Sequence, residues 1–486
     1  MSYETTPIPP AIVPPLDAGF RPASLAHRHV REQLRSAGVP LVIGLERSGG
    51  EVSRFETAVL PDDHPEAGAN VHYVERLVKF LLWQRGGYRI YVGGPRRIGE
   101  SIRACYAPDG LRRFDYHFMG EQVYEREFEV IPCRAEDVPA SREAGKPLGR
   151  HLDGCRIGFD LGASDRKVSA VVDGTVVYSA EVIWQPRTQA DPDYHYHEIR
   201  AALATAAGRM PRVDAIGGSS AGIYVDNRPM VASLFRGIPA ERYGEIRNLF
   251  LRILDEMGVP LEVINDGDVT ALAGSMSIGD NAVLGIALGS SEAAGYVNRD
   301  GHIMGWLNEL AFAPVDYSPD APVDEWSDDR GCGASYFSQQ CVFRLAPRAG
   351  VEIPADVTDA EKLKFVQEKL ETGHAGALKI WQTMGVYLGY GLAHYAGFYD
   401  LKHVLILGRC TSGRGGELLL EGVRNVWSAE FPELPDRIAL HLPDEAVRRV
   451  GQSVAAASLP ALPPGTPPAG GMPPGSPPAG GKGGVA

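Results

Sequence analysis

The sequence predicts a two-lobed α/β protein with mixed sheets, preceded by a smaller α/β unit. A strand, a turn of small residues and a second strand occur twice, in residues 157–172 ("IGFDLGASDRKVSAVV") and 281–297 ("NAVLGIALGSSEAAGYV"). After the first copy, helical and strand patterns alternate, which favours a mixed sheet covered by helices. The length of 486 residues is sufficient for two or three domains. We therefore expect two related lobes that face each other across a cleft.

The first part of the chain predicts an irregular arm in residues 1–23 and a small α/β unit in residues 24–150, whose role the sequence does not indicate. The run Ser48-Gly49-Gly50 between two β-rich segments predicts a hairpin. Three helical patterns and one further strand complete this unit, in the segments "LAHRHVREQLRSAG", "VHYVERLVKFLLWQRGG", "YRIYVGG" and "PRRIGESIRACY".

The remaining chain predicts the two lobes, at about 151–275 and 276–457, and a disordered tail at 458–486. The first lobe is expected to start with three antiparallel strands, because Asp173-Gly174 marks a second hairpin turn. The tail repeats PPAGG and has too few large apolar residues to offset the entropy of ordering.

The composition excludes several classes of protein. With 44% hydrophobic and 22% charged residues, the chain is typical of globular proteins, and no apolar run approaches the roughly 18 residues of a membrane span. Its start lacks the basic and apolar regions of a signal peptide. A formal net charge of -13 disfavours binding to nucleic acid. We expect a cytoplasmic protein with neither a nucleic-acid nor a membrane partner. Because the six cysteines form no CxxC pair, most are expected to be buried thiols.

The first strand-turn-strand copy carries Asp160, Gly162, Ser164 and Lys167 around its turn. A glycine lets a phosphate approach the main chain, a serine hydroxyl and turn amides donate hydrogen bonds to its oxygens, and an acid can hold a magnesium ion. A lysine adds a positive charge. These residues predict a phosphate-binding loop. The alternative is an ordinary hairpin with a glycine turn and solvated charges.

The second copy offers Gly289 and Ser290 at the equivalent turn, so the two loops are expected to hold the phosphates of a nucleotide from opposite sides. Between the copies, "VINDGDVTALAGS" predicts a strand that ends at Asn265 and Asp266 and runs into a helix. A carboxylate at this place can accept a proton from an attacking hydroxyl. The alternative is a helix N-cap, for which Asp268 is the expected residue.

Taken in order, the motifs resemble those of the ROK family of sugar kinases and repressors, within the actin/hexokinase-like ATPase fold, which is a ribonuclease H-like fold. The motifs that carry the resemblance are "DLGASDRK", "INDGDVTALAG", "ALGSSEAAGYVNRDG", "NELAFAPVD", "DRGCGASYFSQQCVFRLA" and "HVLILGRCTSGRGG". They span most of the chain from Cys155 to the tail and leave the N-terminal third unexplained.

The resemblance implies an ATP-dependent sugar kinase that uses Mg2+, with the two glycine-containing loops on the phosphates and Asp160 near the metal. It places Asp266 at the catalytic base, and Asn265 and Glu309 at sugar contacts. It also places Gly408 and Gly413, which follow the strand "HVLIL", at the adenosine. A homodimer is expected only from this resemblance.

The chain departs from the family pattern at its zinc motif. Phe312 stands where the family has a histidine that binds zinc and sugar, and Glu325 and Ser327 stand where it has cysteines, which leaves Cys332 alone. Because one thiol cannot build a tetrahedral zinc site, we predict no structural zinc. Ala334 replaces a further sugar-binding glutamate.

Two more features bear on the function. Glu292, inside the second loop, would repel phosphates unless magnesium lies between them. His195 and His197 lie two residues apart at an expected helix start, and without a third ligand they are interpreted as surface or capping histidines.

These observations favour an ATP-dependent kinase of a sugar or sugar-like small molecule. The alternative is a nucleotide- or sugar-binding regulator of the same fold that has lost phosphoryl transfer. A DNA-binding repressor is ranked last, because one short helix followed by β-rich sequence does not provide a helix-turn-helix.

Overall fold

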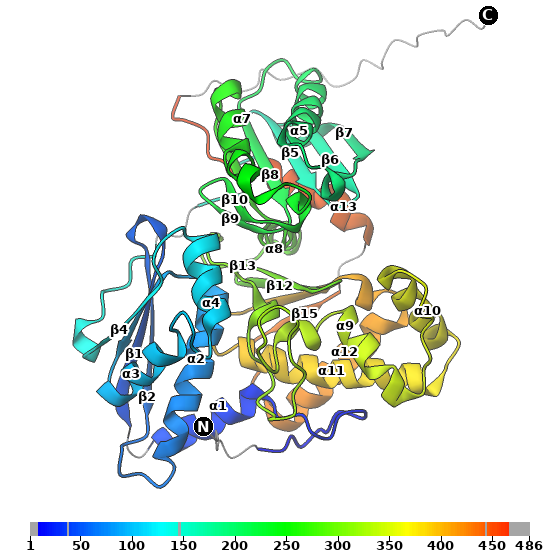
Figure 1. Cartoon of the computed structure of the whole chain (residues 1–486). Coiled ribbons are helices and arrows are strands. Elements are labelled where there is room, and N and C mark those ends of the chain that lie inside the picture. The colour runs from blue at the N-terminus through cyan, green and yellow to red at the C-terminus, as the bar shows by residue number, and fades with distance from the viewer. Residues whose placement is uncertain (1–7, 36–37, 144–146, 443–444, 466–486) are drawn as a thin grey trace, which may run out of the picture.

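The computed structural model describes residues 8–35, 38–143, 147–442 and 445–465. It confirms the predicted class, two α/β lobes with mixed sheets and an N-terminal α/β unit (Figure 1). The first lobe lies at the top of this view, and the N-terminal unit lies beside the second lobe below it. Most of the predicted disordered tail, residues 466–486, lies outside the described residues.

The N-terminal unit is built on a four-stranded sheet in the order β2-β1-β3-β4. The hairpin predicted at Ser48-Gly49-Gly50 joins β1 to β2, which pair antiparallel, and the three predicted helices and the further strand are present. β1 also pairs antiparallel with β3, and β3 pairs parallel with β4. The elements are α1 (Ala23–Leu34), β1 (Val39–Glu46), β2 (Val52–Val59), α2 (Asn70–Arg85), β3 (Arg89–Gly93), α3 (Arg96–Cys105), α4 (Arg113–His117) and β4 (Glu129–Cys133).

The first lobe contains a five-stranded sheet in the order β11-β8-β5-β6-β7. The predicted antiparallel strands are β5, β6 and β7, and the strands that alternate with helices, β8 and β11, extend the sheet in parallel. The elements are β5 (Cys155–Leu161), β6 (Asp165–Val172), β7 (Thr175–Ile183), α5 (Pro192–Ala207), β8 (Ala215–Ser220), β9 (Ile223–Val225), β10 (Arg228–Val231), α6 (Tyr243–Arg247), α7 (Leu249–Met257) and β11 (Leu261–Asn265).

The second lobe repeats the hairpin of the first lobe on a four-stranded sheet in the order β13-β12-β14-β15. β12 and β13 are antiparallel, whereas β14 and β15 continue the sheet in parallel. Helix α8 leads from the first lobe into the second and packs on β12 and β13. The elements are α8 (Asp266–Ile278), β12 (Val283–Leu288), β13 (Glu292–Val297), α9 (Gln339–Leu345), α10 (Asp359–Glu371), α11 (Ala375–Tyr395), β14 (His403–Leu407), α12 (Arg414–Glu430) and β15 (Ala439–His441).

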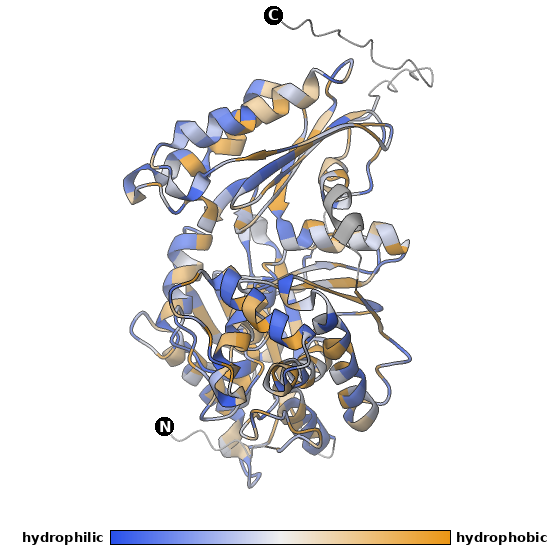
Figure 2. Ribbon diagram, turned by 90° about the vertical axis from the view of Figure 1, so that its right-hand side faces the viewer, coloured by the Kyte–Doolittle hydropathy of each residue, from blue (hydrophilic) through white to orange (hydrophobic). Residues whose placement is uncertain are grey.

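The N-terminal unit and the second lobe share one hydrophobic core, whereas the first lobe has a core of its own. Helix α2 lies inside the shared core: Phe80 stacks on Phe398 with ring centroids 4.0 Å apart, and Trp83 packs on Phe312 at 4.2 Å. Figure 2 shows helices that alternate between hydrophilic and hydrophobic residues along their length, as expected of helices that bury one face. The N-terminal unit is therefore joined to the second lobe by packing.

The last helix, α13 (Glu445–Ala457), returns to the first lobe and packs on β5 and β8 as well as on α8. It lies against the first lobe in Figure 1, although the sequence assigned it to the second. The close contact between α13 and the sheet depends on Gly158 and Gly217, which are paired across β5 and β8. A Cβ on Gly158 would lie 1.8 Å from the carbonyl oxygen of Ser453, and a Cβ on Gly217 would lie 1.6 Å from the carbonyl oxygen of Ala456. No other residue leaves room for the helix backbone at these positions.

Both segments predicted to be irregular contain packed residues. In the arm, Phe20 is buried, and the amide of Leu16 donates to the hydroxyl of Thr383 in α11. The tail boundary expected at Ser458 is too early, because Ser458 and Leu459 are buried and the Ser458 hydroxyl accepts a hydrogen bond from the amide of Arg150. Within the described residues, no helix combines the length and the hydropathy that a membrane crossing requires.

Candidate functional site

The first predicted loop lies between β5 and β6, at the edge of the first lobe that faces the second. Asp160 and Lys167 are cross-strand partners, and their carboxylate and ammonium groups are 3.8 Å apart. The Ser219 hydroxyl donates to Asp160 at 2.7 Å. The turn is closed by Gly162, whose amide donates to the carbonyl of Asp165. The structure therefore brings Asp160 and Lys167 together.

Ser164 lies at the exposed tip of the same turn. Its hydroxyl is 3.5 Å from the carboxylate of Asp165, and its carbonyl accepts a hydrogen bond from the amide of Trp184. Trp184 also donates its indole N–H to the carbonyl of Gly162 at 2.9 Å. The buried Trp184 thus holds the turn through these two hydrogen bonds, and the Ser164 side chain lies at the surface.

Asn265 and Asp266 stand at the junction of β11 and α8, as predicted. The N-cap is Asn265, whose side-chain oxygen accepts from the amide of Gly267 at 2.7 Å and whose side-chain amide donates to the carbonyl of Gly222. The alternative role for Asp268 is therefore wrong. Its carboxylate is buried in the first turn of α8, where the amide of Tyr296 donates to it.

Carboxyl groups with raised pKa values gather around this first turn. Burial and the negative charge of Asp160 raise the pKa of Asp266 to about 6. Burial raises the pKa of Asp268 to about 7, and burial together with the charges of Asp266 and Asp268 raises that of Glu309 to about 7. Desolvation disfavours the charged form, and like charges add to the effect. A cluster of this kind, beside small-residue turns, is typical of functional sites.

The second predicted loop joins β12 to β13 and exposes Ser290 and Ser291. The amide of Gly289 donates to the carbonyl of Ser291, which closes the turn. Of the residues predicted here, Gly289 and Ser290 therefore occupy the position in the second lobe that Gly162 and Ser164 occupy in the first.

Glu292 does not face this loop, so the expected repulsion of phosphates is wrong. The side chain is buried beneath the hairpin, where the Tyr395 hydroxyl donates to it at 2.9 Å. A Cβ on Gly333 would lie 2.0 Å from the other carboxyl oxygen. Burial, reinforced by the charge of Glu309, raises the pKa of Glu292 to about 8. The group is therefore mainly uncharged at neutral pH.

Gly408 and Gly413 enclose a short turn between β14 and α12. A Cβ on Gly408 would lie 2.4 Å from the carbonyl oxygen of Leu288, so the glycine allows this turn to approach the second loop. Gly413 is the N-cap of α12, with a φ of 60°. The predicted turn is present at this place, and the contact with adenosine stays a prediction.

Three cavities are lined by residues of the predicted site. The largest, of about 800 Å³, runs from Asp266 along α8 between the lobes, and Gln452 of α13 forms part of its wall. Asn265 lines another, of about 320 Å³. Glu309 lines the third, of about 460 Å³, together with Ser290. The predicted sugar contacts Asn265 and Glu309 thus open into different cavities.

The cavity of about 460 Å³ holds three of the positions at which the chain departs from the ROK pattern. Phe312, Glu325 and Ala334 line it, and so does Trp326, which is 75% exposed. The sequence reasoning missed Trp326. The signal that could have identified it is its position directly after Glu325, in the segment where the chain departs from the zinc motif of the family.

The described residues contain no group of three or more histidine, cysteine, aspartate or glutamate side chains suited to a metal ion. Cys332 is buried 3.8 Å from the carboxylate of Asp329. Cys155, Cys341 and Cys410 are also buried, whereas Cys105 and Cys133 are partly exposed.

The interpretation of His195 as a surface or capping residue is wrong. Its ring is buried against Phe235, with centroids 5.0 Å apart, and burial lowers its pKa to about 4. Asp191 is the N-cap of α5 instead. His197 is exposed on the same helix.

No protein-family model matches the chain, and no curated protein matches it. Among solved structures, it is similar to a ROK family glucokinase from Streptomyces griseus in complex with glucose and AMPPNP (20% identity, 62% of this chain and 99% of that chain, TM-score 0.45). It is similar to a ROK hexokinase from Thermus thermophilus (16% identity, 62% and 97%, TM-score 0.49). It is also similar to a ROK family transcriptional regulator, a homologue of the E. coli MLC protein (18% identity, 63% and 79%, TM-score 0.47). These structures belong to the family that the sequence motifs resemble.

Proposed function

We propose that this protein is an ATP-dependent kinase that phosphorylates a hydroxyl group of a sugar or sugar-like small molecule. The observation that carries the proposal is the position of Asp266. It stands at the first turn of α8, close enough to Asp160 to sense its charge, and has a pKa of about 6. A carboxylate with this pKa is mostly ionised at neutral pH and still basic enough to accept a proton.

In the proposed reaction, Asp266 accepts the proton of the acceptor hydroxyl while the acceptor oxygen forms a bond to the γ-phosphorus of ATP. The bond between that phosphorus and the β,γ-bridging oxygen breaks, and ADP leaves. Gly289 and Ser290 hold the phosphates from the second lobe, and Lys167 adds positive charge from the first. Closure of the lobes would exclude water from the reacting groups.

The carboxylate of Asp160 fits a magnesium ion, because Mg2+ prefers oxygen ligands and takes only one or two carboxylates when phosphates supply the others. The hydrogen bond from Ser219 and the ion pair with Lys167 fix the orientation of this carboxylate. When bound, magnesium would neutralise charge on the phosphates.

The alternative is a nucleotide- or sugar-binding regulator of the same fold. It is favoured by Phe312 and Ala334, which offer no polar side chain to the cavity of about 460 Å³, called the acceptor cavity below because the predicted sugar contact Glu309 lines it. Glu292 no longer favours it, because this carboxyl group is buried and mainly uncharged.

The test is ADP release by the purified protein with ATP and Mg2+ across hexoses, amino sugars and polyols. We expect Asp266→Asn to lower substrate-stimulated turnover by about 100-fold or more, because the hydroxyl loses its base, while ATP still binds. Asp255→Asn, at an exposed aspartate of α7, is the matched control and should retain turnover. If ATP binds and no compound stimulates turnover in the wild type, the regulator is favoured.

A further inference from the structure

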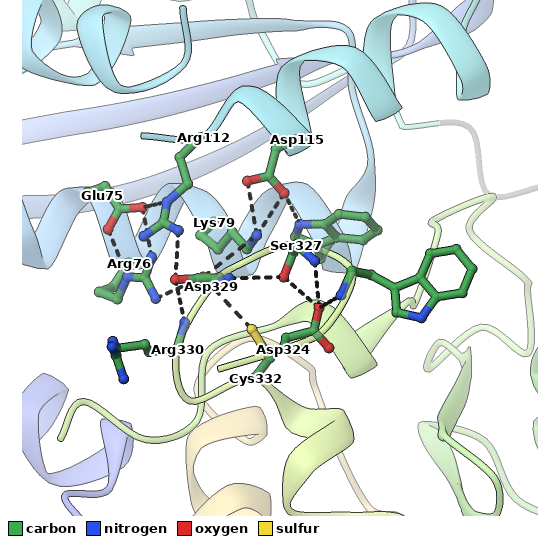
Figure 3. Close-up of polar contacts among 12 residues, drawn as sticks. Glu75, Arg76, Lys79, Arg112, Asp115, Asp324, Ser327, Asp329, Arg330 and Cys332 are labelled. Carbon is green, nitrogen blue, oxygen red and sulfur yellow. Dashed lines mark hydrogen bonds and ion pairs between the residues drawn. The ribbon is translucent and has the colours of Figure 1, made fainter. Parts of the chain in front are cut away.

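Six charged side chains form a closed buried cluster between the N-terminal unit and the loop of residues 322–332, called the Asp329 loop below. Figure 3 shows them meeting in the gap between α2, the segment around α4, and this loop. Among the described residues, their ion pairs join them only to one another. The members are Glu75, Arg76, Lys79, Arg112, Asp115 and Asp329.

Asp329 is the only member that comes from outside the N-terminal unit. Its carboxylate lies 2.6 Å from Arg112, 3.1 Å from Arg76 and 3.6 Å from Lys79. It is 5% exposed. Burial raises its pKa, but the charges of Arg76 and Lys79 outweigh that effect and hold the pKa below its usual value. Asp329 is therefore ionised.

The charges of this cluster balance only when the Asp329 loop is docked. The N-terminal unit contributes three cations and two carboxylates, and Asp329 supplies the third carboxylate. Without it, one buried positive charge would be left uncompensated, which is strongly unfavourable. The N-terminal unit thus specifies where this loop must lie.

The contact at Asp329 also fixes the side of the loop that faces the acceptor cavity. The carboxylate of Asp324 accepts from the amides of Trp326 and Ser327, at 3.2 Å and 2.8 Å, and from the Ser327 hydroxyl. The amide of Asp324 donates to the carbonyl of Asp329 at 2.7 Å. Residues 324–329 therefore form one braced turn, and Glu325 and Trp326 project from it into the acceptor cavity.

The end of α2 holds Glu309, another residue that lines the same cavity. A helix leaves its last carbonyl groups without partners inside the helix. Here the carbonyls of Trp83 and Gln84 accept hydrogen bonds from the amides of Glu309 and Asn308, at 3.0 Å and 2.9 Å. One helix of the N-terminal unit thus holds both Glu309 and the Asp329 loop.

We propose that Asp329 is a positioning residue, through which the N-terminal unit fixes the Asp329 loop as a wall of the acceptor cavity and so determines acceptor binding. The role in acceptor binding rests on the proposed kinase function; the role in holding the loop does not. Buried ion pairs are poor stabilisers compared with apolar packing, but they define one geometry, which is what a substrate wall requires.

The test compares Asp329→Asn with the double variant Asp329→Asn/Arg112→Gln. The single variant keeps the shape but leaves a buried positive charge without compensation, so it also lowers the melting temperature. In the double variant the remaining charges form two balanced pairs, Glu75 with Arg76 and Lys79 with Asp115. Its melting temperature should return most of the way to that of the wild type, while the ion pairs of residue 329 with the N-terminal unit stay lost.

Two readouts separate positioning from stability. Hydrogen exchange of peptides that cover 322–332 should be about tenfold faster in both variants than in the wild type. With the best acceptor of the sugar panel, the KM for the acceptor should rise about tenfold in both, while kcat and the KM for ATP change less than about threefold. Asp328→Asn is the matched control, because its ion pair with Arg113 joins the same loop and the same unit at an exposed site.

Unchanged exchange of 322–332 in both variants would overturn the inference, whatever the turnover. Faster exchange with an unchanged acceptor KM would overturn the role in acceptor binding. If the wild type phosphorylates nothing, the proposed kinase function fails, and the exchange experiment still decides whether Asp329 holds the loop.

Discussion

The side chain of Glu292 shows how burial changes what a residue can do. In sequence it lies beside two serines of a predicted phosphate loop, and its charge suggested interference. In the structure it is the first residue of β13 and its side chain lies in the core, where Tyr395 donates to it and its pKa is about 8. Ser291, in the turn before β13, is exposed.

This carboxyl group predicts that stability falls as the pH rises. Its folded pKa of about 8 lies above its ordinary value of 4.5, so the folded state binds the proton more tightly. The contribution is complete below about pH 4.5 and is lost as the pH rises towards 8. From pH 5 to 9, the free energy of unfolding should fall roughly 3 to 5 kcal/mol more in the wild type than in Glu292→Gln.

Urea denaturation at several pH values measures this difference. Glu352→Gln, at an exposed glutamate, is the control and should keep the slope of the wild type. An equal slope in Glu292→Gln would show that Glu292 is ionised throughout.

Among elements, α13 is the one whose position the sequence did not indicate. Its amphipathic pattern specifies a helix and a buried face, but the groove that receives it is made by Gly158 and Gly217, more than two hundred positions earlier. Hairpins and the β11 to α8 junction were predictable, because turn residues and periodicity are local. The place of a helix on a distant sheet is not encoded in its own residues.

Gly217→Ala should therefore displace α13 from the sheet. The added methyl group would meet the carbonyl oxygen of Ala456, and we expect a loss of about 2 to 4 kcal/mol in the free energy of unfolding. Hydrogen exchange of the α13 peptide should rise with it. Gly244→Ala in α6, where an added Cβ meets nothing within 4 Å, is the matched control. Equal exchange of α13 in the two variants would contradict this account.

At the scale of the whole molecule, the structure contains two large hydrophobic cores, and they do not coincide with the three parts suggested by the sequence. The first lobe has its own core, and the N-terminal unit shares one with the second lobe. The boundary near residue 150 was predicted from composition and pattern. The shared core could not be predicted in this way, because Phe80 and Phe398 become neighbours only through the fold.

The candidate site also contains positions that local patterns predict and positions that depend on the fold. Local patterns correctly place Asp160, Asp266 and Ser290 at turns and at a helix start, and the roles assigned to them stay predictions. They misjudged Asp268 and His195, whose partners Tyr296 and Phe235 come from other elements. Polar residues near helix starts favour caps on average, and tertiary burial overrides that preference.

Phe80→Ala should consequently destabilise α11, which is distant in the sequence, as well as α2. We expect a loss of about 3 to 5 kcal/mol and faster hydrogen exchange in α11 as well as in α2, because both helices line the same core. Exchange in α5, which belongs to the first lobe, should stay as in the wild type. Phe250→Ala, in the core of the first lobe, should give the reverse pattern. Faster exchange confined to α2 would contradict the shared core.

The return of α13 to the first lobe also determines the order in which the protein can be completed. During synthesis, the five strands of the first lobe emerge before the second lobe exists, and their sheet carries an open groove at Gly158 and Gly217. Domains generally fold as units from the N-terminal side while the ribosome is still adding residues. Here α13 is complete only when residue 457 has been added. A nascent chain stalled before α13 would therefore contain the sheets of both lobes but leave the groove at Gly158 and Gly217, and the face of α8 that packs on α13, uncovered.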